Sequence, residues 1–436
     1  MDKIFSIIKA EKRRQKEQLQ LIPSENYASS EVMKAVGSVM MNKYAEGYPK
    51  KRYYQGNKYL DQVEDLARER ILKAFGLSPK KWGVNVQPYS GSPANLAVYN
   101  ALLKPGDKMM GMYLPDGGHL THGWHLPDRP ISITSKFWTS QFYHVDKKTL
   151  VFNYAQITRQ AKKFKPQIII SGGTAYPRTI NHKKLGAIAK SVGAYYLADI
   201  AHEAGLIAAG VHPTPFPDCD VATFTTHKTW RGPRGAVIVA RKSLIDKINF
   251  SIFPGLQGGP HLHTIAGIAV ATGELMTPGY KTYARQIVKN AQRLAANLKK
   301  NGFNIVSGGT DKHLVLIDLR NKKLSGWVVA WALEAANIIA NRNTVPYDTA
   351  SPYYPSGLRI GTPAVTSRGM KEAQMDKIAD WITKVVEVVK DERLPDEPKA
   401  RNRFANNFRT RIAKNQELKR IGREVKRLCL RYGIRS

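Results

Sequence analysis

A lysine directly after an apolar run is the first candidate for chemistry in this sequence. Lys228 lies in the segment T-T-H-K-T at 225–229, which follows the strand-like run V-A-T-F at 221–224. Surface lysines usually lie on polar helix faces, whereas hydroxyl groups and a histidine beside a lysine can desolvate and orient it. A desolvated amine is neutral and can attack a carbonyl, so Lys228 is a candidate for a Schiff base. The alternative is a solvated loop lysine.

A carboxylate ends another apolar run. Asp199 follows the run A-Y-Y-L-A at 194–198, and it precedes Lys228 by 29 residues. Taken alone, an aspartate at this position can cap the N-terminus of a helix. The functional alternative is a partner for a pyridinium nitrogen, because a carboxylate there keeps the ring protonated and able to accept electrons.

Small and hydroxyl residues precede a predicted helix at S-G-S-P-A-N, residues 90–95. A proline at the first helical position and exposed N–H groups at a helix N-terminus form a site that attracts anions. The alternative is an ordinary helix cap. A second glycine-rich stretch, G-L-Q-G-G at 255–259, could bring backbone amides to a phosphate.

These segments follow short apolar runs that alternate with helical patterns, which predicts an α/β fold with a mostly parallel sheet and helices on both faces. In such sheets, ligands bind beyond the carboxyl ends of the strands. We expect a helix over 93–103 and strands over 84–86, 108–114, 167–171, 194–198, 221–225 and 236–240.

The pattern changes near residue 276, where M-T-P-G at 276–279 interrupts a long helical stretch. We therefore expect a helical arm over 1–20, a large domain over 21–276 and a smaller α+β domain over 277–436. Residues 399–436 contain 13 basic and 2 acidic residues. Apolar side chains at helical spacing predict that this stretch ends the small domain as a basic amphipathic helix: Leu418, Ile421, Val425 and Leu428.

The composition excludes several classes of protein. Of the 436 residues, 42% are hydrophobic and 23% are charged, which is typical of globular domains and not of disordered or collagen-like chains. No apolar run is long enough to span a membrane. The first residues lack a secretory signal, and the two cysteines form neither a disulfide framework nor a metal motif, so we expect a cytoplasmic protein.

The net charge of +34 is unusual and attracts polyanions. The simplest interpretation is a solvated basic surface. RNA binding stays open, although no RNP, KH or zinc motif supports it.

The anion site at residues 90–92, which we call the phosphate cradle, is followed along the chain by Asp199 and Lys228, and each comes after a strand of the predicted sheet. A phosphate cradle, an aspartate and a lysine in this order are the layout of an aspartate-aminotransferase-like enzyme. The sequence resembles the serine hydroxymethyltransferase family from about Leu21 to Arg368, with weaker similarity in the last helix. The motifs that carry the resemblance are P-S-E-N-Y at 23–27, N-K-Y-A-E-G-Y-P at 42–49, R-Y-Y at 52–54, G-G-H-L-T-H-G at 117–123, T-H-K-T at 226–229, R-G-P-R-G at 231–235 and L-R-I-G-T-P at 358–363.

The resemblance implies a fold-type I α/β enzyme dependent on pyridoxal 5'-phosphate, with a large domain built on a mostly parallel sheet and a smaller α+β C-terminal domain. The implied transferase reaction belongs to one-carbon and amino-acid metabolism. It interconverts L-serine plus tetrahydrofolate with glycine plus 5,10-methylenetetrahydrofolate, through aldimines of the cofactor. No metal is implied.

The resemblance also implies roles for individual residues. The implied catalytic residues are Lys228 for the Schiff base, Glu46 as acid/base, His119 stacked on the ring, Asp199 at the ring nitrogen, and Tyr54. The implied cofactor-binding residues are Ser90, Gly91, Ser92, His119, Thr174, Asp199, His202, Thr225, His227, Lys228, Tyr54, Gly258 and Gly259, with Gly258 and Gly259 supplied by a second subunit. The implied substrate-binding residues are Ser24, Tyr44, Glu46, Tyr54, His202 and Arg359, where Arg359 grips the carboxylate.

Folate contacts and the assembly follow from the same resemblance. Leu114, Gly118, Leu120 and Asn343 match positions that contact tetrahydrofolate, and the family forms homodimers with shared active sites, with a tetramer also open. Two other functions remain to be weighed. One is a folate-independent aldolase of β-hydroxy amino acids, and the other is a polyanion-binding protein with vestigial catalytic residues.

Overall fold

The computed structural model describes residues 2–434. The described chain divides into two compact units, one formed by residues 28–285 and the other by residues 2–27 with 286–434. The expected boundary near residue 276 coincides with the turn between α10 (Leu262–Leu275) and α11 (Pro278–Lys300), whereas the units divide within α11. Residues 21–27, expected in the large domain, belong to the second unit, where Leu21 exchanges backbone hydrogen bonds with Ile339 and Gly361.

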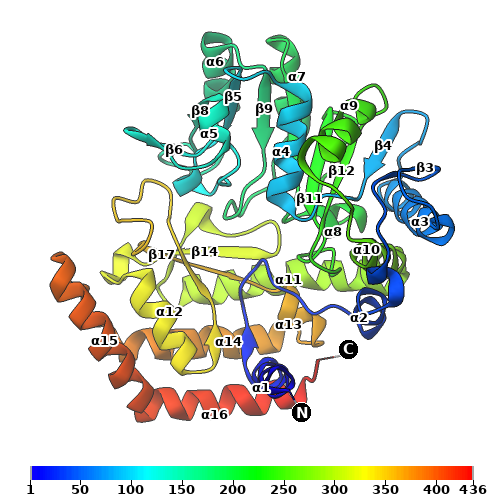
Figure 1. Ribbon diagram of the computed structural model, residues 1–436. Coiled ribbons are helices and arrows are strands. Elements are labelled where there is room, and N and C mark those ends of the chain that lie inside the picture. The colour runs from blue at the N-terminus through cyan, green and yellow to red at the C-terminus, as the bar shows by residue number, and fades with distance from the viewer. Residues whose placement is uncertain (1, 435–436) are drawn as a thin grey trace. The chain divides into compact units, whose positions relative to one another are not determined.

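A seven-stranded sheet organises the unit of residues 28–285, in the order β4-β12-β11-β10-β9-β5-β8 (Figure 1). The five strands from β11 to β8 run parallel, and β12 is antiparallel to both of its neighbours. The mostly parallel sheet is therefore confirmed. The strands are β4 (Trp82–Asn85), β5 (Lys108–Met112), β8 (Thr139–Tyr143), β9 (Ile168–Ser171), β10 (Tyr195–Asp199), β11 (Val221–Thr225) and β12 (Ala236–Arg241).

The central strands form because their apolar runs are buried on both faces of the sheet, as parallel strands require. Every residue of β9 and β11 is buried. The helices of this unit include α2 (Ser30–Val36), α3 (Lys58–Ala74), α4 (Gly91–Leu102), α5 (Thr134–Phe137), α6 (Tyr154–Phe164), α7 (His182–Ser191), α8 (Ala204–Ala208), α9 (Ile245–Phe250) and α10. Short hairpins are formed by β2 (Gly47–Tyr48) with β3 (Lys51–Arg52) and by β6 (His125–Leu126) with β7 (Arg129–Pro130).

The other unit contains a four-stranded antiparallel sheet in the order β13-β14-β17-β16. Its strands are β13 (Asn304–Ile305), β14 (Leu314–Asp318), β16 (Asn341–Asn343) and β17 (Gly357–Gly361), and a separate pair joins β1 (Leu19–Gln20) to β15 (Ile338–Ile339). Its helices are α1 (Lys3–Glu17), α12 (Gly326–Ala335), α13 (Pro363–Ser367), α14 (Glu372–Val388), α15 (Pro398–Lys414) and α16 (Gln416–Arg431), and α12, α14, α15 and α16 pack together (Figure 1).

The stretch from residue 399 forms two helices instead of the single helix that we expected. Asn415 separates them, because its backbone is extended and its side-chain oxygen accepts the amide of Leu418, 3.0 Å away, at the start of α16. The apolar face of α16 is buried as predicted, since Leu418, Ile421 and Val425 belong to the core of this unit. Among the described helices, none combines the length and the hydrophobicity that a membrane span needs.

Candidate active site

The parallel strands bring the predicted residues to one edge of the sheet. The strands β9, β10 and β11 are neighbours, and their carboxyl ends lead into residues 172–174, 200–202 and 226–228. The helix α4 begins at the same edge, because Gly91 lies against the side chain of Thr225. One pocket is lined by Gly91, His119, Gly173, Thr174, Asp199, Ala201, His202, Thr225 and Lys228.

Asp199 occupies the centre of a buried hydrogen-bond network. Its Oδ2 accepts a bond of 2.8 Å from Nδ2 of Asn95 and lies 3.3 Å from Nε2 of His122. Its Oδ1 accepts the amide of Ala201, whereas α8 begins only at Ala204, so Asp199 is not the cap of that helix. Burial alone would raise the pKa of Asp199, but the hydrogen bonds from His122 and Asn95 and the neighbouring histidines hold it below the ordinary value. The pocket therefore contains a carboxylate that stays ionised.

His119 provides a neutral ring beside this carboxylate. Its Nδ1 lies 2.8 Å from the hydroxyl of Thr121, which also accepts from Asn95. Burial lowers the pKa of His119 to about 4. The charges of His122 and Lys228 also lower this pKa, whereas the charge of Asp199 raises it. At neutral pH the ring is therefore uncharged and can stack on an aromatic ligand. The ligand atoms of His119, His122 and Asp199 lie within 4.8 Å of one another, an arrangement that could also hold a metal ion.

The loop after β11 presents Lys228 to the pocket. Thr226 closes this loop, because its amide donates to Gly235 and its hydroxyl donates to the carbonyl of Pro233, 2.6 Å away. Thr229 joins it to the neighbouring strand end, since its hydroxyl donates to the carbonyl of His202 over 3.0 Å. Lys228 lines a pocket between these anchors, which favours the Schiff-base alternative over a solvated loop lysine.

The start of α4 and the end of β11 fit a phosphate group. The Ser90 side chain makes no hydrogen bond to the helix that it precedes, so the ordinary cap does not occupy it. A Cβ at Gly91 would lie 2.7 Å from Cγ2 of Thr225, so only glycine allows this close approach. Within the described chain, the buried Oγ1 of Thr225 and Nδ1 of His227 have no hydrogen-bond partner. Hydroxyl groups, helix N–H groups and a histidine suit the oxygens of a phosphate.

The segment around Gly118 lies close to this pocket. The hydroxyl of Thr174 donates to the carbonyl of Gly118 over 2.8 Å, and a Cβ at Gly118 would lie 2.2 Å from the carbonyl oxygen of Met112. Leu114 and Leu120 flank Gly118, and the side chain of Leu120 is exposed. An apolar side chain is thus available to a ligand beside His119.

A second group of predicted residues gathers elsewhere in the same unit. Glu46 Oε1 lies 3.1 Å from the position of a Cβ at Gly258, and ring atoms of Tyr44 lie 3.4 to 3.6 Å from that of Gly259. The ring of Tyr54 packs edge-on against that of Tyr44, with centroids 5.1 Å apart. None of these residues lines the pocket of Lys228. The side chains are presented outward, with Tyr44 56% and Tyr54 39% exposed.

Ser24, Arg359 and Asn343 belong to the other unit. Arg359 is buried on β17, where its Nε donates to Oδ1 of Asn341 over 3.2 Å, and burial lowers its pKa to about 10. Asn343 lies on β16 beside β17. A Cβ at Gly361, the last residue of β17, would lie 2.7 Å from Cα of Pro23, so the turn that contains Ser24 packs on the end of this strand.

Two residues of the network were not predicted from the sequence. They are His122 and Asn95, which lie in the motifs at 117–123 and 90–95. The available signal was spacing, because Asn95 lies one helical turn after Gly91 and His122 lies one turn after His119.

Comparison with known proteins identifies the family. The family model described as "Serine hydroxymethyltransferase" matches residues 1–382. The protein named serine hydroxymethyltransferase from Sorangium cellulosum is 52% identical over 389 residues, which cover 89% of this chain and 90% of the relative. The same name is carried by a protein of Acidothermus cellulolyticus, 51% identical over 88% of both chains. A mitochondrial serine hydroxymethyltransferase of Schizosaccharomyces pombe is 45% identical over 97% of this chain and 90% of its own. The chain therefore belongs to the serine hydroxymethyltransferase family.

Proposed function

We propose that this protein uses pyridoxal 5'-phosphate to interconvert L-serine and tetrahydrofolate with glycine and 5,10-methylenetetrahydrofolate. The observation that supports this proposal is the pocket at the sheet edge, where Lys228, the ionised Asp199 and the neutral His119 lie together. When bound, the cofactor supplies a ring that accepts electrons from the α-carbon of an amino acid.

Each side chain of the pocket has a separate task in this proposal. Lys228 holds the cofactor aldehyde, Asp199 keeps a proton on the ring nitrogen, and His119 covers one ring face. His202 lies beside the ring, and the phosphate is held by the α4 N-terminus with residues around it: Ser90, Gly91, Ser92, Thr174, Thr225 and His227. Asn95 and His122 fix the carboxylate of Asp199.

Substrate and folate are held by other residues. Arg359 binds the carboxylate of serine, because a guanidinium forms two parallel hydrogen bonds with a carboxylate. Ser24 and Tyr44 also bind the substrate. Glu46 exchanges a proton with the serine hydroxyl group and with the folate. The pterin contacts Leu114, Gly118, Leu120 and Asn343.

The protein acts as a homodimer in this proposal, with Glu46, Tyr54, Gly258 and Gly259 serving the site of the partner subunit. The support is that these residues form an outward-facing group that does not line the pocket of their own chain. Other exposed apolar side chains suit burial against a second copy. They lie in the segment 39–59 and on α1: Val39, Met41, Tyr53 and Tyr59, and Ile4, Phe5, Ile7 and Ile8.

The visible absorption of the purified protein tests the proposed activity. A coloured protein whose band is absent in Lys228→Ala establishes the cofactor and its lysine. A further red-shifted band that needs both glycine and tetrahydrofolate establishes the coupling to folate. If glycine alone gives that band and serine cleavage ignores folate, the protein is a folate-independent aldolase. A colourless protein that the cofactor cannot reconstitute contradicts the proposal.

A second candidate function is binding of RNA or another polyanion, and it is favoured by the exposed basic residues of α16. Lys419, Arg423, Arg427 and Arg431 are exposed, and no ion pair engages them in the described chain. Truncation is a poor test because the opposite face of α16 is part of the core. Replacing these four residues with glutamine should raise the dissociation constant for RNA and flatten its salt dependence. An unchanged affinity contradicts this function.

We also propose a cytoplasmic location, which fractionation of the source cells tests.

A further inference from the structure

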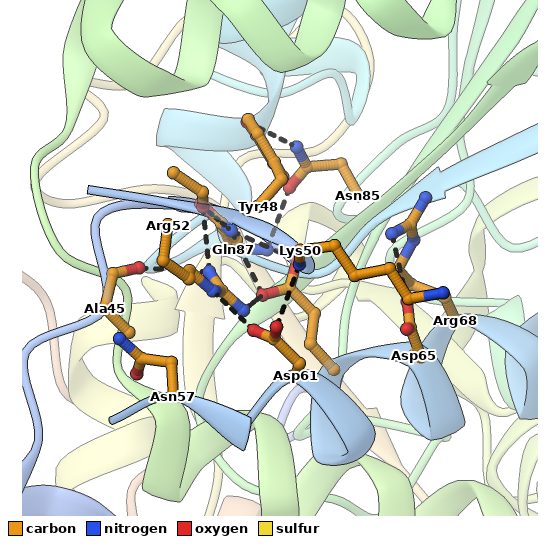
Figure 2. A network of polar contacts seen from close by, with 12 residues as sticks. Ala45, Tyr48, Lys50, Arg52, Asn57, Asp61, Asp65, Arg68, Asn85 and Gln87 are labelled. Atoms are coloured by element: carbon orange, nitrogen blue, oxygen red, sulfur yellow. Dashed lines mark hydrogen bonds and ion pairs between the residues drawn. The ribbon is translucent and has the colours of Figure 1, made fainter. Parts of the chain in front are cut away.

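A buried polar network underlies the segment 44–54, which carries the proposed acid/base Glu46. Arg52 occupies its centre (Figure 2). The Arg52 side chain is 3% exposed, and its Nε donates to Oδ1 of Asp61 over 2.8 Å while its Nη2 donates to Oε2 of Glu64 over 2.7 Å. Both carboxylates lie on α3. The network therefore joins this segment to a helix.

The guanidinium also holds the backbone on both sides of Glu46. Its Nη1 donates to the carbonyls of Ala45 and Gly47, over 3.0 and 2.8 Å. The amide of Tyr53 donates to the carbonyl of Glu46 over 3.0 Å. The segment is thus fixed through its backbone, while the side chains of Tyr44 and Tyr54 remain exposed.

Gln87 extends the network from this segment to the sheet (Figure 2). Its Nε2 donates to the carbonyl of Gly47 over 3.0 Å and to the two carboxylate oxygens of Glu64 over 3.0 and 3.2 Å. Glu64 is 1% exposed, and burial raises its pKa although Arg52 and Gln87 oppose the shift. A buried carboxylate of this kind depends on every one of its donors.

The backbone of Gln87 faces a third segment. Its carbonyl accepts Nε2 of Gln257 over 2.9 Å, and Oε1 of Gln257 accepts the amide of Tyr89 over 3.2 Å. The hydroxyl of Tyr89 donates to the carbonyl of Gly259 over 2.8 Å. Residues 87–89 lead directly into Ser90. Gln87 therefore contacts both the segment of Glu46 and the segment of Gly258, and it lies three residues before the phosphate cradle.

We propose that Gln87 is a positioning residue that couples the segment of Glu46 and Tyr54 to the phosphate cradle and to Gly258-Gly259. Its side-chain amide fixes the first segment, and its backbone, bracketed by Gln257, fixes the other two. This inference rests on the proposed function, in which the cradle serves one site of the dimer and Glu46 serves the other. Through Gln87, the position of residues in one active site of the dimer then depends on the position of residues in the other.

Hydrogen–deuterium exchange of the purified full-length protein tests the coupling without any reference to activity. Gln87→Met keeps the length of the side chain and removes its donors. We expect amides in 44–54 and 87–92 to exchange about tenfold faster or more. The matched control is Gln141→Met on the edge strand β8, which makes the same replacement and should leave both segments unchanged. Equal exchange in the two variants overturns the proposal. If Gln87→Met does not fold, Gln87→Asn, whose shorter amide reaches neither partner, is measured instead.

A kinetic cycle with Glu46→Gln separates positioning from a general structural role. We expect Gln87→Met to lower kcat about tenfold to 100-fold in the otherwise unchanged protein, and by a clearly smaller factor when Glu46 is already replaced, because the part of the effect that acts through Glu46 is then absent. The same factor in both backgrounds overturns the positioning role. Should the unchanged protein lack activity with serine while Gln87→Met still accelerates exchange, the coupling stands and the proposed function fails. Should the protein be active while exchange is unaffected, only the coupling fails.

Discussion

The carboxylate of Asp199 and the imidazole of His122 face each other inside the unit of residues 28–285, with Nε2 of His122 3.3 Å from Oδ2 of Asp199. Both side chains are buried, and Asn95 completes the arrangement from α4. A buried carboxylate resists ionisation unless donors and positive charge compensate for the lost water. His122 thereby determines the protonation of a residue that the proposed chemistry requires to be negative.

We therefore expect His122→Phe to make cofactor binding sensitive to acid. Burial raises the pKa of Asp199, and the imidazole of His122 lowers it. Without the imidazole the pKa rises, so the carboxylate becomes protonated at a higher pH than in the unchanged protein. The dissociation constant of pyridoxal 5'-phosphate, measured by absorption from pH 8 down to about pH 5, should then increase at a higher pH in the variant.

His125→Phe is the matched control, because His125 bonds to the carbonyl of Gly123 and not to Asp199. Parallel pH profiles for His122→Phe and the unchanged protein would show that the imidazole does not govern this carboxylate.

The lowered pKa of His119 predicts a pH dependence of stability in the cofactor-free protein. The folded pKa of about 4 lies below the ordinary 6.5, so the unfolded chain binds the proton more tightly. The free energy of unfolding must then decrease as pH falls from about 6.5 to about 4, by about 3 kcal/mol for this group.

His119→Phe should remove this contribution, because phenylalanine takes up no proton in either state. The loss of Tm between pH 7 and about pH 4.5 should be smaller in the variant than in the unchanged protein. An equal loss in both proteins would mean that His119 is not desolvated in the folded state.

Thr225→Val should weaken cofactor binding without lowering the stability of the cofactor-free protein. The buried Oγ1 of Thr225 has no partner in the described chain, so its replacement by a methyl group leaves the Tm of the cofactor-free protein unchanged or slightly raised. If this hydroxyl donates to the phosphate, affinity for pyridoxal 5'-phosphate falls about tenfold, the effect of one hydrogen bond to a charged group.

Thr223→Val, two residues earlier on β11, gives the contrasting control. The hydroxyl of Thr223 donates to Oδ1 of Asn95 over 2.6 Å, so its loss should lower the Tm. A Thr225→Val protein that binds the cofactor as tightly as the unchanged protein would exclude this hydroxyl from the phosphate site.

The sequence predicts the central strands well because buried parallel strands need uninterrupted apolar runs, which few other elements share. Residues 221–225 were expected to form a strand and do so as β11. The ends of such strands also indicated where Asp199 and Lys228 lie. The separation of α15 from α16 was not predicted, because Asn415 stands in a polar helical pattern and its role as a cap depends on its own extended backbone.

The partners of the site residues were harder to predict, since they depend on which distant segments become neighbours. Asn95 meets Asp199 only because α4 begins beside β11. Likewise, Gln87 and Gly47 are 40 positions apart in sequence, and no local pattern pairs them. Local periodicity therefore locates strand ends, whereas the hydrogen bonds between them follow from the order of the strands in the sheet.

Arg368 contributes to the stability of the unit of residues 2–27 and 286–434. Its guanidinium is buried and donates to backbone carbonyls at the ends of two helices. They are Gln15 and Lys16 of α1, at 3.0 and 2.8 Å, and Cys429 of α16, and the guanidinium also bonds to Tyr432 beyond α16. Helix C-termini carry partial negative charge, so one cation stabilises both ends.

Arg368→Met should lower the free energy of unfolding by about 3 kcal/mol, because it leaves these carbonyls buried without their donor. Hydrogen exchange should accelerate in α1 and α16, while the peptides of the seven-stranded sheet stay protected. Arg368→Lys should recover only part of the loss. An ammonium group has three donors instead of five and lacks the planar fork of a guanidinium, so it cannot donate to the ends of both helices at once. Exchange that accelerates throughout the chain would instead indicate global unfolding and contradict the local role of Arg368.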